Sequence, residues 1–226
     1  MHVVDFAFHG LGWLNLFQWD CEVYFDVPRQ RFAVSASGRP GDVDMLIVPC
    51  VGQERRWEDA IAIEVKAYRL ARSNRNKSPG DSGRAQVVGL AEMGFPFVGL
   101  LHVVPVEAGD DDEWAMLPVW PTNTPMALKA EPTSYLATDL SGVNFYLRQS
   151  GRVRRLSLPE CAGAKVLWLT LGHDGLIGGM SVGEERAPSR NPQTSPELIS
   201  RLPDAVADWE GLRCGYPPAK FRVRRI

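Results

Sequence analysis

Three apolar runs rich in β-branched residues dominate the hydrophobic pattern in the first half of the chain. They cover residues 42–48, 60–68 and 97–104, and each is followed by proline or by a polar loop. Uninterrupted apolar runs of this length are typical of strands buried on both faces of a sheet. The pattern therefore predicts three central strands, with Pro49 ending the first and Pro105 ending the third.

A helical spacing separates the second of these runs from the third. Val87, Leu90 and Ala91 fall on one stripe of a helix that Ser82 can cap and that ends near Met93, with Gly94 at the C-terminal cap. A helix that joins two parallel strands of one sheet crosses over right-handed. We therefore expect an α/β fold with a mixed central sheet flanked by helices.

The segments before the central strands carry weaker signals. Residues 5–26 predict a helix followed by a strand over Cys21 to Val27, because aromatic residues at helical spacing give way to an alternating pattern. Arg31 to Ser35 predicts a short β-type run that leads into a Gly/Pro turn at residues 38–41.

The second half of the chain has a pattern of short strands and turns. Residues 142–158 and 165–180 each predict a hairpin, because β-type runs flank glycine-containing turns. Ser195–Pro196 predicts the start of a short helix. The expected organisation is an α/β core over residues 1–119 and a β-rich C-terminal extension over residues 120–226 that packs on it.

Composition narrows the class of protein. The 226 residues are 45% hydrophobic, which is enough for a full core, and the formal net charge of −2 gives no global attraction to nucleic acid. The four cysteines are far apart, which argues against a zinc ribbon and indicates reduced thiols. No signal peptide is evident and every apolar run is interrupted before about 18 residues, so we expect a soluble, cytoplasmic protein.

Charged side chains interrupt the apolar runs at positions that share a strand face. Asp42 and Asp44 begin the first central strand, and Glu64 and Lys66 lie within the second. Residues two apart in a strand point to the same side, so these side chains converge if the two strands are neighbours. Burying them is costly unless a cation or a partner neutralises them, and this cost indicates a functional site.

Carboxylates without histidine or cysteine select a hard cation, Mg²⁺, with Mn²⁺ as a substitute. Such a metal neutralises charge on a phosphodiester and lowers the pKa of bound water, while Lys66 can orient that water or stabilise the developing charge. Asp44 is the better ligand, because Asp42 also fits a turn. Glu64 and Lys66 also fit a purely structural ion pair.

These residues resemble the PD-(D/E)XK nuclease superfamily, whose restriction-endonuclease-like fold is shared by restriction, repair and phage-defence nucleases. Asp44, nineteen intervening residues and then Glu64-Val65-Lys66 look like its acidic residue and its E-x-K pair. The resemblance implies that Asp44, Glu64 and the Val65 carbonyl bind the metal. It also implies that Lys66 lies near the nucleophilic water.

Two further positions match this superfamily. Gln86 corresponds to a polar residue that faces the site from the following helix, and Glu22 would correspond to an acid on an N-terminal helix if the chain is helical there. The resemblance implies a Mg²⁺-dependent deoxyribonuclease, with DNA favoured over RNA, while the residues themselves leave open whether it is an endonuclease or an exonuclease. A homodimer or a partner protein would suit two cuts on a duplex, and no membrane association is expected.

Cations near the proposed site would hold the phosphate backbone. The first set lies in the loop after the E-x-K strand and at the start of the next helix: Arg69, Arg72, Arg75, Lys77 and Arg84. A second set lies on the predicted hairpin: Arg148, Arg152, Arg154 and Arg155. If these cations bind phosphates, the affinity for duplex DNA falls as the salt concentration rises. The logarithm of the binding constant then falls against the logarithm of the salt concentration with a slope of about −0.9 per neutralised phosphate.

Other interpretations remain open. The same fold could serve as a catalytically silent module that binds nucleic acid or protein. A carboxylate-pair hydrolase such as a glycosidase is a weaker alternative, because Lys66 and the lack of an aromatic sugar subsite argue against it. His102 lies in an apolar strand and fits a hydrogen-bonded core histidine, and the acidic residues of 107–113 fit a solvated turn.

Overall fold

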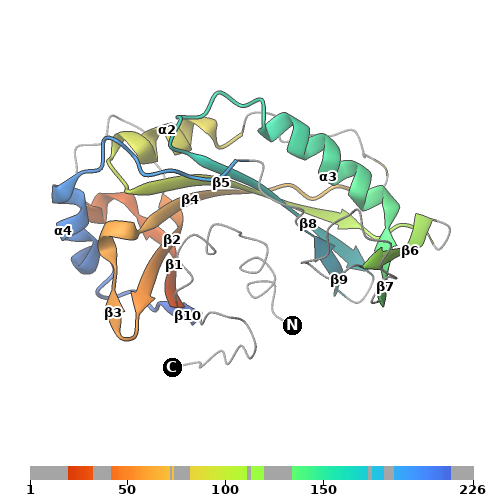
Figure 1. The fold of residues 1–226 in the computed structure, drawn as a ribbon, viewed down its shortest axis with the longest axis horizontal. Helices are drawn as coiled ribbons and strands as arrows, with labels where there is room; N and C mark the ends of the chain where they lie inside the picture. The colour runs from red at the N-terminus through yellow and green to blue at the C-terminus, as the bar shows by residue number, and fades with distance from the viewer. Residues whose placement is uncertain are drawn as a thin grey trace, which may run out of the picture.

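The computed structural model describes residues 20–32, 42–71, 73, 82–110, 113–119, 134–172, 175–180 and 186–214 (Figure 1). The strands are β1 (Asp20–Pro28), β2 (Asp42–Val51), β3 (Glu54–Arg55), β4 (Ile61–Ala67), β5 (Phe97–Glu107), β6 (Trp114–Val119), β7 (Ser134–Asp139), β8 (Gly163–Gly172), β9 (Gly175–Met180) and β10 (Leu212–Cys214). The α-helices are α2 (Arg84–Glu92), α3 (Leu140–Val153) and α4 (Pro196–Ala205), and the short 3-10 helices are η2 (Arg29–Phe32) and η3 (Trp57–Asp59).

An eight-stranded mixed sheet organises these elements. Its order is β10-β1-β2-β4-β5-β8-β9, and β3 pairs with β2. The strand pairs β4–β5 and β5–β8 are parallel, whereas β1–β2, β2–β4 and β8–β9 are antiparallel. The prediction of an α/β fold with a mixed central sheet is confirmed, and the three predicted central strands are β2, β4 and β5.

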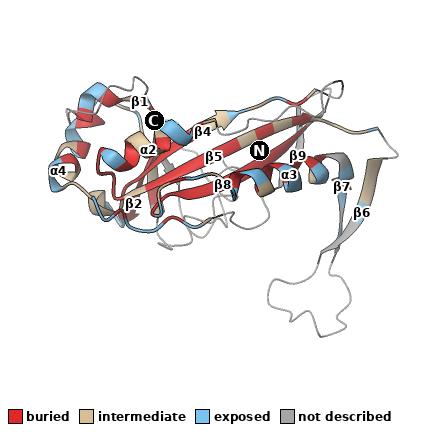
Figure 2. Ribbon diagram, turned by 90° about the horizontal axis from the view of Figure 1, so that it is seen from above, coloured by how far each residue is buried: buried red, intermediate tan, exposed pale blue. Residues whose placement is uncertain are grey.

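The helices cover one face of this sheet (Figure 1). Leu90 of α2 and Tyr146 of α3 belong to the same core cluster as Ala62, Leu100 and Val166 of the sheet. The intervening strand residues form a second cluster on the other face, which includes Ile61, Ile63, Leu101 and Leu167. Both faces are therefore buried, and β5 and β8 are buried along most of their length (Figure 2), as expected for parallel strands.

The two prolines do not end their strands as predicted. Pro49 lies inside β2 and pairs with Cys21, beyond Ile47, the last β2 residue paired with β4. Pro105 lies inside β5 and pairs with Leu169, and its carbonyl accepts a hydrogen bond from the Leu70 amide at 2.8 Å. A strand tolerates proline where no neighbouring strand requires its missing N–H, which explains Pro49.

Two other local predictions need correction. Arg31 and Phe32, predicted to start a β-type run, belong to the 3-10 helix η2, and the rest of that run and the turn at 38–41 lie outside the described residues. Ser82 is not the N-cap of α2, because Gly83 occupies that position in a left-handed conformation. The predicted strand at Cys21 to Val27 is confirmed as β1, and the helix predicted before it lies outside the described residues.

The hairpin predicted over residues 142–158 is wrong, because most of this segment is the helix α3. Tyr146, Gln149 and Val153 are buried, and their spacing of three and four residues follows one helical face that packs on β8. Gly142 permits this packing, since a Cβ there would lie 2.5 Å from the Trp168 ring. Gly142 and Gly151, in the segment where a turn was predicted, are thus helical residues.

The hairpin and the helix predicted nearer the C-terminus are confirmed. Strands β8 and β9 form the hairpin predicted over 165–180, and α4 begins after Ser195, whose Oγ accepts a hydrogen bond from the Leu198 amide at 3.2 Å. The proposed division at residue 119 stays a prediction. Strands from both sides of it share the central sheet, since β8 pairs with β5.

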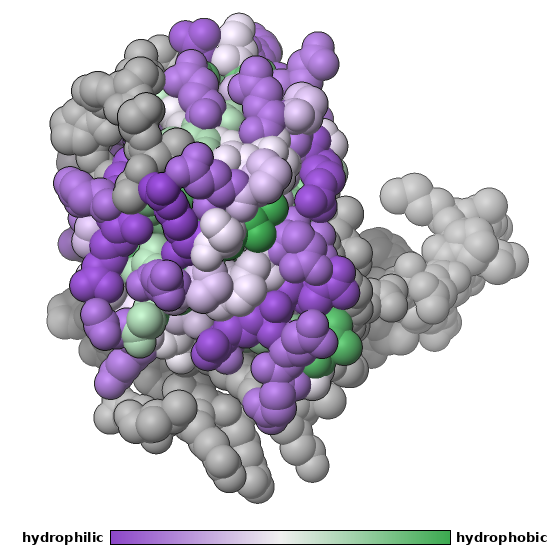
Figure 3. All heavy atoms as spheres, turned by 90° about the vertical axis from the view of Figure 1, so that its left-hand side faces the viewer, coloured by the Kyte–Doolittle hydropathy of each residue, from purple (hydrophilic) through white to green (hydrophobic). Residues whose placement is uncertain are grey.

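The surface at the end of the molecule that carries α4 is mainly hydrophilic. Figure 3 shows this end, where the described side chains leave only small, separate hydrophobic areas. Within the described ranges, no helix has the length and apolar character required to cross a membrane.

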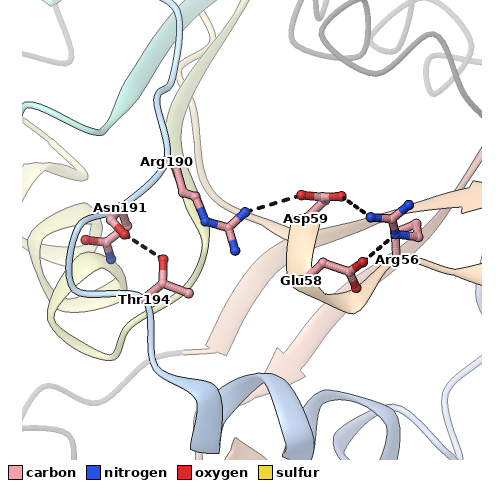
Figure 4. A network of polar contacts seen from close by, with 6 residues as sticks. All are labelled: Arg56, Glu58, Asp59, Arg190, Asn191 and Thr194. Carbon is pink, nitrogen blue, oxygen red and sulfur yellow. Dashed lines mark hydrogen bonds and ion pairs between the residues drawn. The ribbon is translucent and has the colours of Figure 1, made fainter.

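A polar network fastens the segment before α4 to the rest of the core (Figure 4). Asn191 is buried, and its Nδ2 donates hydrogen bonds to the carbonyls of Ala91 at 2.8 Å and Phe95 at 3.0 Å. At the surface, Arg190 lies 3.4 Å from Asp59 of η3. Asn191 therefore anchors this segment to the turn between α2 and β5.

We predict that Asn191→Ala lowers the free energy of unfolding by about 2 kcal/mol, because it leaves buried carbonyl groups without their donor. Arg190→Ala is the matched control and should cost less than about 1 kcal/mol, since its ion pair is exposed. Urea unfolding monitored by tryptophan fluorescence measures both. Equal losses for the two variants would contradict the anchoring role of Asn191.

Candidate active site

The predicted acidic residues meet where the ladder between β2 and β4 ends. The paired residues are Ile47 with Ile61, Leu46 with Ala62 and Met45 with Ile63, so Asp44 and Glu64 come next on the two strands. Beyond the last pair, the backbone N–H of Val65 donates a hydrogen bond to Asp44 Oδ2 at 2.7 Å. The structure therefore brings Asp44 and Glu64 together on neighbouring strands.

Glu64 and Lys66 share the sheet face that the helices cover. The Glu64 side chain is buried, and the Lys66 side chain is 26% exposed, so the lysine reaches the carboxylate from the solvent side. Lys66 Nζ lies 2.5 Å from Glu64 Oε1. The two charges form a direct, partly desolvated ion pair.

The start of α2 lies directly on these side chains. Gly83 has a φ of +86°, and a Cβ at this position would lie 2.5 Å from Leu100 Cδ1 and 3.2 Å from Lys66 Cγ. Only glycine combines this left-handed conformation with such close contact. Sequence reasoning missed Gly83, although the adjacent Ser-Gly pair marks a turn before the helix.

The electrostatics of the site are dominated by burial and by the second carboxylate. Burial raises the pKa of Glu64, and the nearby charge of Asp44 raises it further, against the opposing effects of Lys66 and Arg29. Burial lowers the pKa of Lys66, but the hydrogen bond to Glu64 and the attraction of both carboxylates outweigh it, so the pKa is raised. Lys66 is therefore a cation at neutral pH.

His102 connects the site to α3 and to the turn before α2. It pairs with Lys66 in the β4–β5 ladder and is fully buried. Its Nε2 lies 3.0 Å from the Ser82 carbonyl, which can only accept, and Gln149 Nε2 donates to its Nδ1 at 2.8 Å. Burial lowers its pKa, so the ring is neutral. The interpretation of His102 as a hydrogen-bonded core residue is confirmed.

The other predicted residues lie around this centre or away from it. Gln86 is half-buried on α2, and Asp42 is exposed at the start of β2. Glu22 lies on β1 and not on a helix, and its Oε2 accepts hydrogen bonds from Arg55 and Tyr24, both at 2.6 Å. Its register partner on β2 is Val48, four residues from Asp44, so Glu22 does not join the site.

The first set of predicted phosphate-binding cations is only partly described. Arg69 is exposed and lies 3.4 Å from Glu107, and Arg84 Nε donates to the Ser157 carbonyl at 2.8 Å. The remaining members, Arg72, Arg75 and Lys77, lie outside the described residues.

The donor set fits a hard divalent cation. Carboxylates from two neighbouring strands offer oxygen ligands, and Mg²⁺ commonly uses one or two carboxylates while it retains several waters. The Val65 carbonyl stays a predicted ligand. Within the described part of the chain, no group of three or more His, Cys, Asp and Glu side chains forms a larger metal cage.

One charged residue near the site was not predicted. Arg29, the first residue of η2, is 7% exposed, and its charge acts on Glu64. It follows a proline and precedes the exposed residues Gln30 and Arg31. No spacing in the sequence separates Arg29 from these solvent-facing neighbours, so only the packing of η2 against the sheet reveals it.

Comparisons with known proteins add no family to this description. The chain matches no protein-family model, no curated protein and no solved structure. Its function has to be inferred from the side chains of the site and their surroundings.

We predict that the free energy of unfolding falls as the pH rises from about 4.3 through the raised pKa of Glu64, because the native state keeps a proton that the unfolded chain has lost. Glu64→Gln should remove this part of the decline and make the protein more stable than wild type at pH 7. Urea titrations between pH 4 and pH 8 measure the effect. Glu160→Gln, at an exposed site, is the control, and a decline in Glu64→Gln equal to that in wild type would contradict the prediction.

Proposed function

We propose that this protein is a Mg²⁺-dependent nuclease that hydrolyses phosphodiester bonds, with DNA as the favoured substrate. The proposal includes a restriction-endonuclease-like core of the PD-(D/E)XK type. It rests on one observation: Asp44 and Glu64 meet at the end of the β2–β4 ladder, with Lys66 paired to Glu64.

Different residues of the site would bind the metal and stabilise the developing charge. Asp44, Glu64 and the Val65 carbonyl would hold the metal, and the Val65 N–H would keep the Asp44 carboxylate in place. A bound Mg²⁺ supplies charge neutralisation at the phosphate and a lowered pKa for its water. Lys66, a cation with a raised pKa, would donate hydrogen bonds and stabilise negative charge, and it would not act as a general base.

The order of elements supports this type of core. The acid-bearing strand β2 is followed by the E-x-K strand β4, the helix α2 and the parallel strand β5. The resemblance to the PD-(D/E)XK superfamily implies the same order of acid-bearing strand, E-x-K strand, helix and strand. In this chain the start of α2 lies over the E-x-K residues, because Gly83 contacts Lys66.

Basic side chains next to the site support an anionic polymer as substrate. The contact from Arg84 to Ser157 brings the segment after α3 against the start of α2, and Arg154 and Arg155 are exposed in that segment. Cations placed in this way can contact phosphates along a backbone. Binding would weaken as salt rises.

A second candidate function is a silent binding module of the same fold. The observation that favours it is the close Glu64–Lys66 pair, because a lysine can neutralise a buried carboxylate without any metal. The two functions differ in their response to divalent cations, since a protein that binds a metal only when folded is stabilised by it.

We predict that Mg²⁺ or Mn²⁺ raises the melting temperature of the wild-type protein and that Asp44→Asn abolishes this rise. The physical reason is that the metal binds only the folded arrangement of two carboxylates. Asp59→Asn is the matched control, since Asp59 lies at the other end of β4. Differential scanning fluorimetry with a metal titration gives the answer, and no rise in wild type would favour the binding module.

Lys66→Ala should lower the rate of DNA cleavage by at least about 10²-fold, because a positioned charge is lost from the transition state. DNA affinity should change little, and EDTA should stop the wild-type reaction. Cleavage of a labelled duplex, alongside a binding assay in chelator, separates these effects. Wild-type cleavage by Lys66→Ala would remove Lys66 from the mechanism, and full activity in EDTA would exclude the metal.

A further inference from the structure

Arg29 is buried in a way that structural arginines rarely are. Its side chain belongs to a residue that is 7% exposed, and two of its three guanidinium nitrogens, Nε and Nη2, are buried. Within the described part of the chain, no group accepts a hydrogen bond from either of them. Buried charges in proteins are normally paired, so this guanidinium is arranged for a partner that the described residues do not supply.

The guanidinium lies against α2, the helix that begins over the carboxylates. Arg29 Nη1 is 3.2 Å from the position that a Cβ of Gly89 would take, so the lack of a side chain at Gly89 makes room for it. Gly83, the N-cap of α2, lies against Lys66 in the same way. The same helix therefore contacts Lys66 through Gly83 and Arg29 through Gly89.

Arg29 also lies at the end of the sheet that carries the carboxylates, because the preceding residue, Pro28, pairs with Asp42, two residues before Asp44. Arg29 and Lys66 are thus two cations that come from different elements. A guanidinium offers a planar set of donors that matches phosphate oxygens.

We propose that Arg29 binds a phosphate oxygen of the nucleic-acid substrate beside the carboxylates, with Gly89 providing the space that its guanidinium needs. The identity of the anion as a nucleic-acid phosphate rests on the proposed function. The binding of a phosphate group by Arg29 does not require that the protein cleaves anything.

The test measures phosphate binding in chelator, without metal and without turnover. Inorganic phosphate and a 5′-phosphorylated DNA oligonucleotide are titrated against the full chain by calorimetry. Arg29→Gln should weaken both affinities at least tenfold, and Gly89→Ala should weaken them several-fold, since its methyl group displaces the guanidinium. Arg31→Gln and Gly151→Ala are the matched controls and should stay within twofold, because Arg31 is exposed and a Cβ at Gly151 meets nothing within 4 Å.

The melting temperature of Arg29→Gln separates a phosphate-binding arginine from a structural one, because the two roles predict shifts in opposite directions. Arg29→Gln should raise the melting temperature, because it removes a buried charge that has unpartnered donors; an arginine that holds the fold together would lower it on substitution. If Arg29→Gln does not fold, a structural role is favoured unless Gly89→Ala folds and loses phosphate affinity.

The outcomes separate this inference from the proposed function. Unchanged phosphate affinity in Arg29→Gln or Gly89→Ala, or no phosphate binding by wild type, overturns the inference even if DNA is cleaved. Phosphate binding that depends on Arg29, in a protein that cleaves no DNA, supports the inference and removes the nuclease. Cleavage together with a raised KM and a little-changed kcat in Gly89→Ala supports both.

Discussion

The hydrogen bond from the Val65 amide to the Asp44 carboxylate is the contact on which the arrangement of the site depends. It forms where the backbone ladder between β2 and β4 has ended, so a side chain takes over the role of a strand carbonyl. This places the carboxylate of one strand next to Glu64 of the other. It also leaves the side chains of Glu64 and Lys66 on the helix-covered face, where the start of α2 and the His102 hydrogen bonds enclose them.

The part of the fold that carries this contact follows from local pattern. Strands β2, β4 and β5 are apolar runs, and α2 has a clear stripe, so both their type and their order could be predicted. The period of two in a strand is enough to place Glu64 and Lys66 on one face. The wrong predictions, a hairpin in place of α3 and strand ends at Pro49 and Pro105, share a cause. The structure of each of these segments depends on the elements that pack beside it, which the local sequence does not show. Gly142, for instance, fits a helix because Trp168 of β8 approaches it closely.

The site was predictable only where its residues are close in sequence or lie on adjacent strands. The E-x-K triplet is local, and Asp44 joins it through simple antiparallel pairing. Gly83 and Arg29 become part of the surroundings through long-range packing of α2 and η2 on the sheet. Glu22 shows the converse, since its acidic character suggested a role that its position on β1, beside Arg55 and Tyr24, does not support.

The pKa of Glu64 is set by a balance between burial and nearby charges. An opposite charge lowers the pKa of a carboxyl group, whereas burial raises it. Here the pKa of Glu64 is raised, although Lys66 forms a direct ion pair with it and Arg29 also opposes the rise. Burial is the largest cause of the rise, and the charge of Asp44 adds to it, so together they outweigh both cations. A cation bound between the two carboxylates would favour their charged forms and lower this pKa.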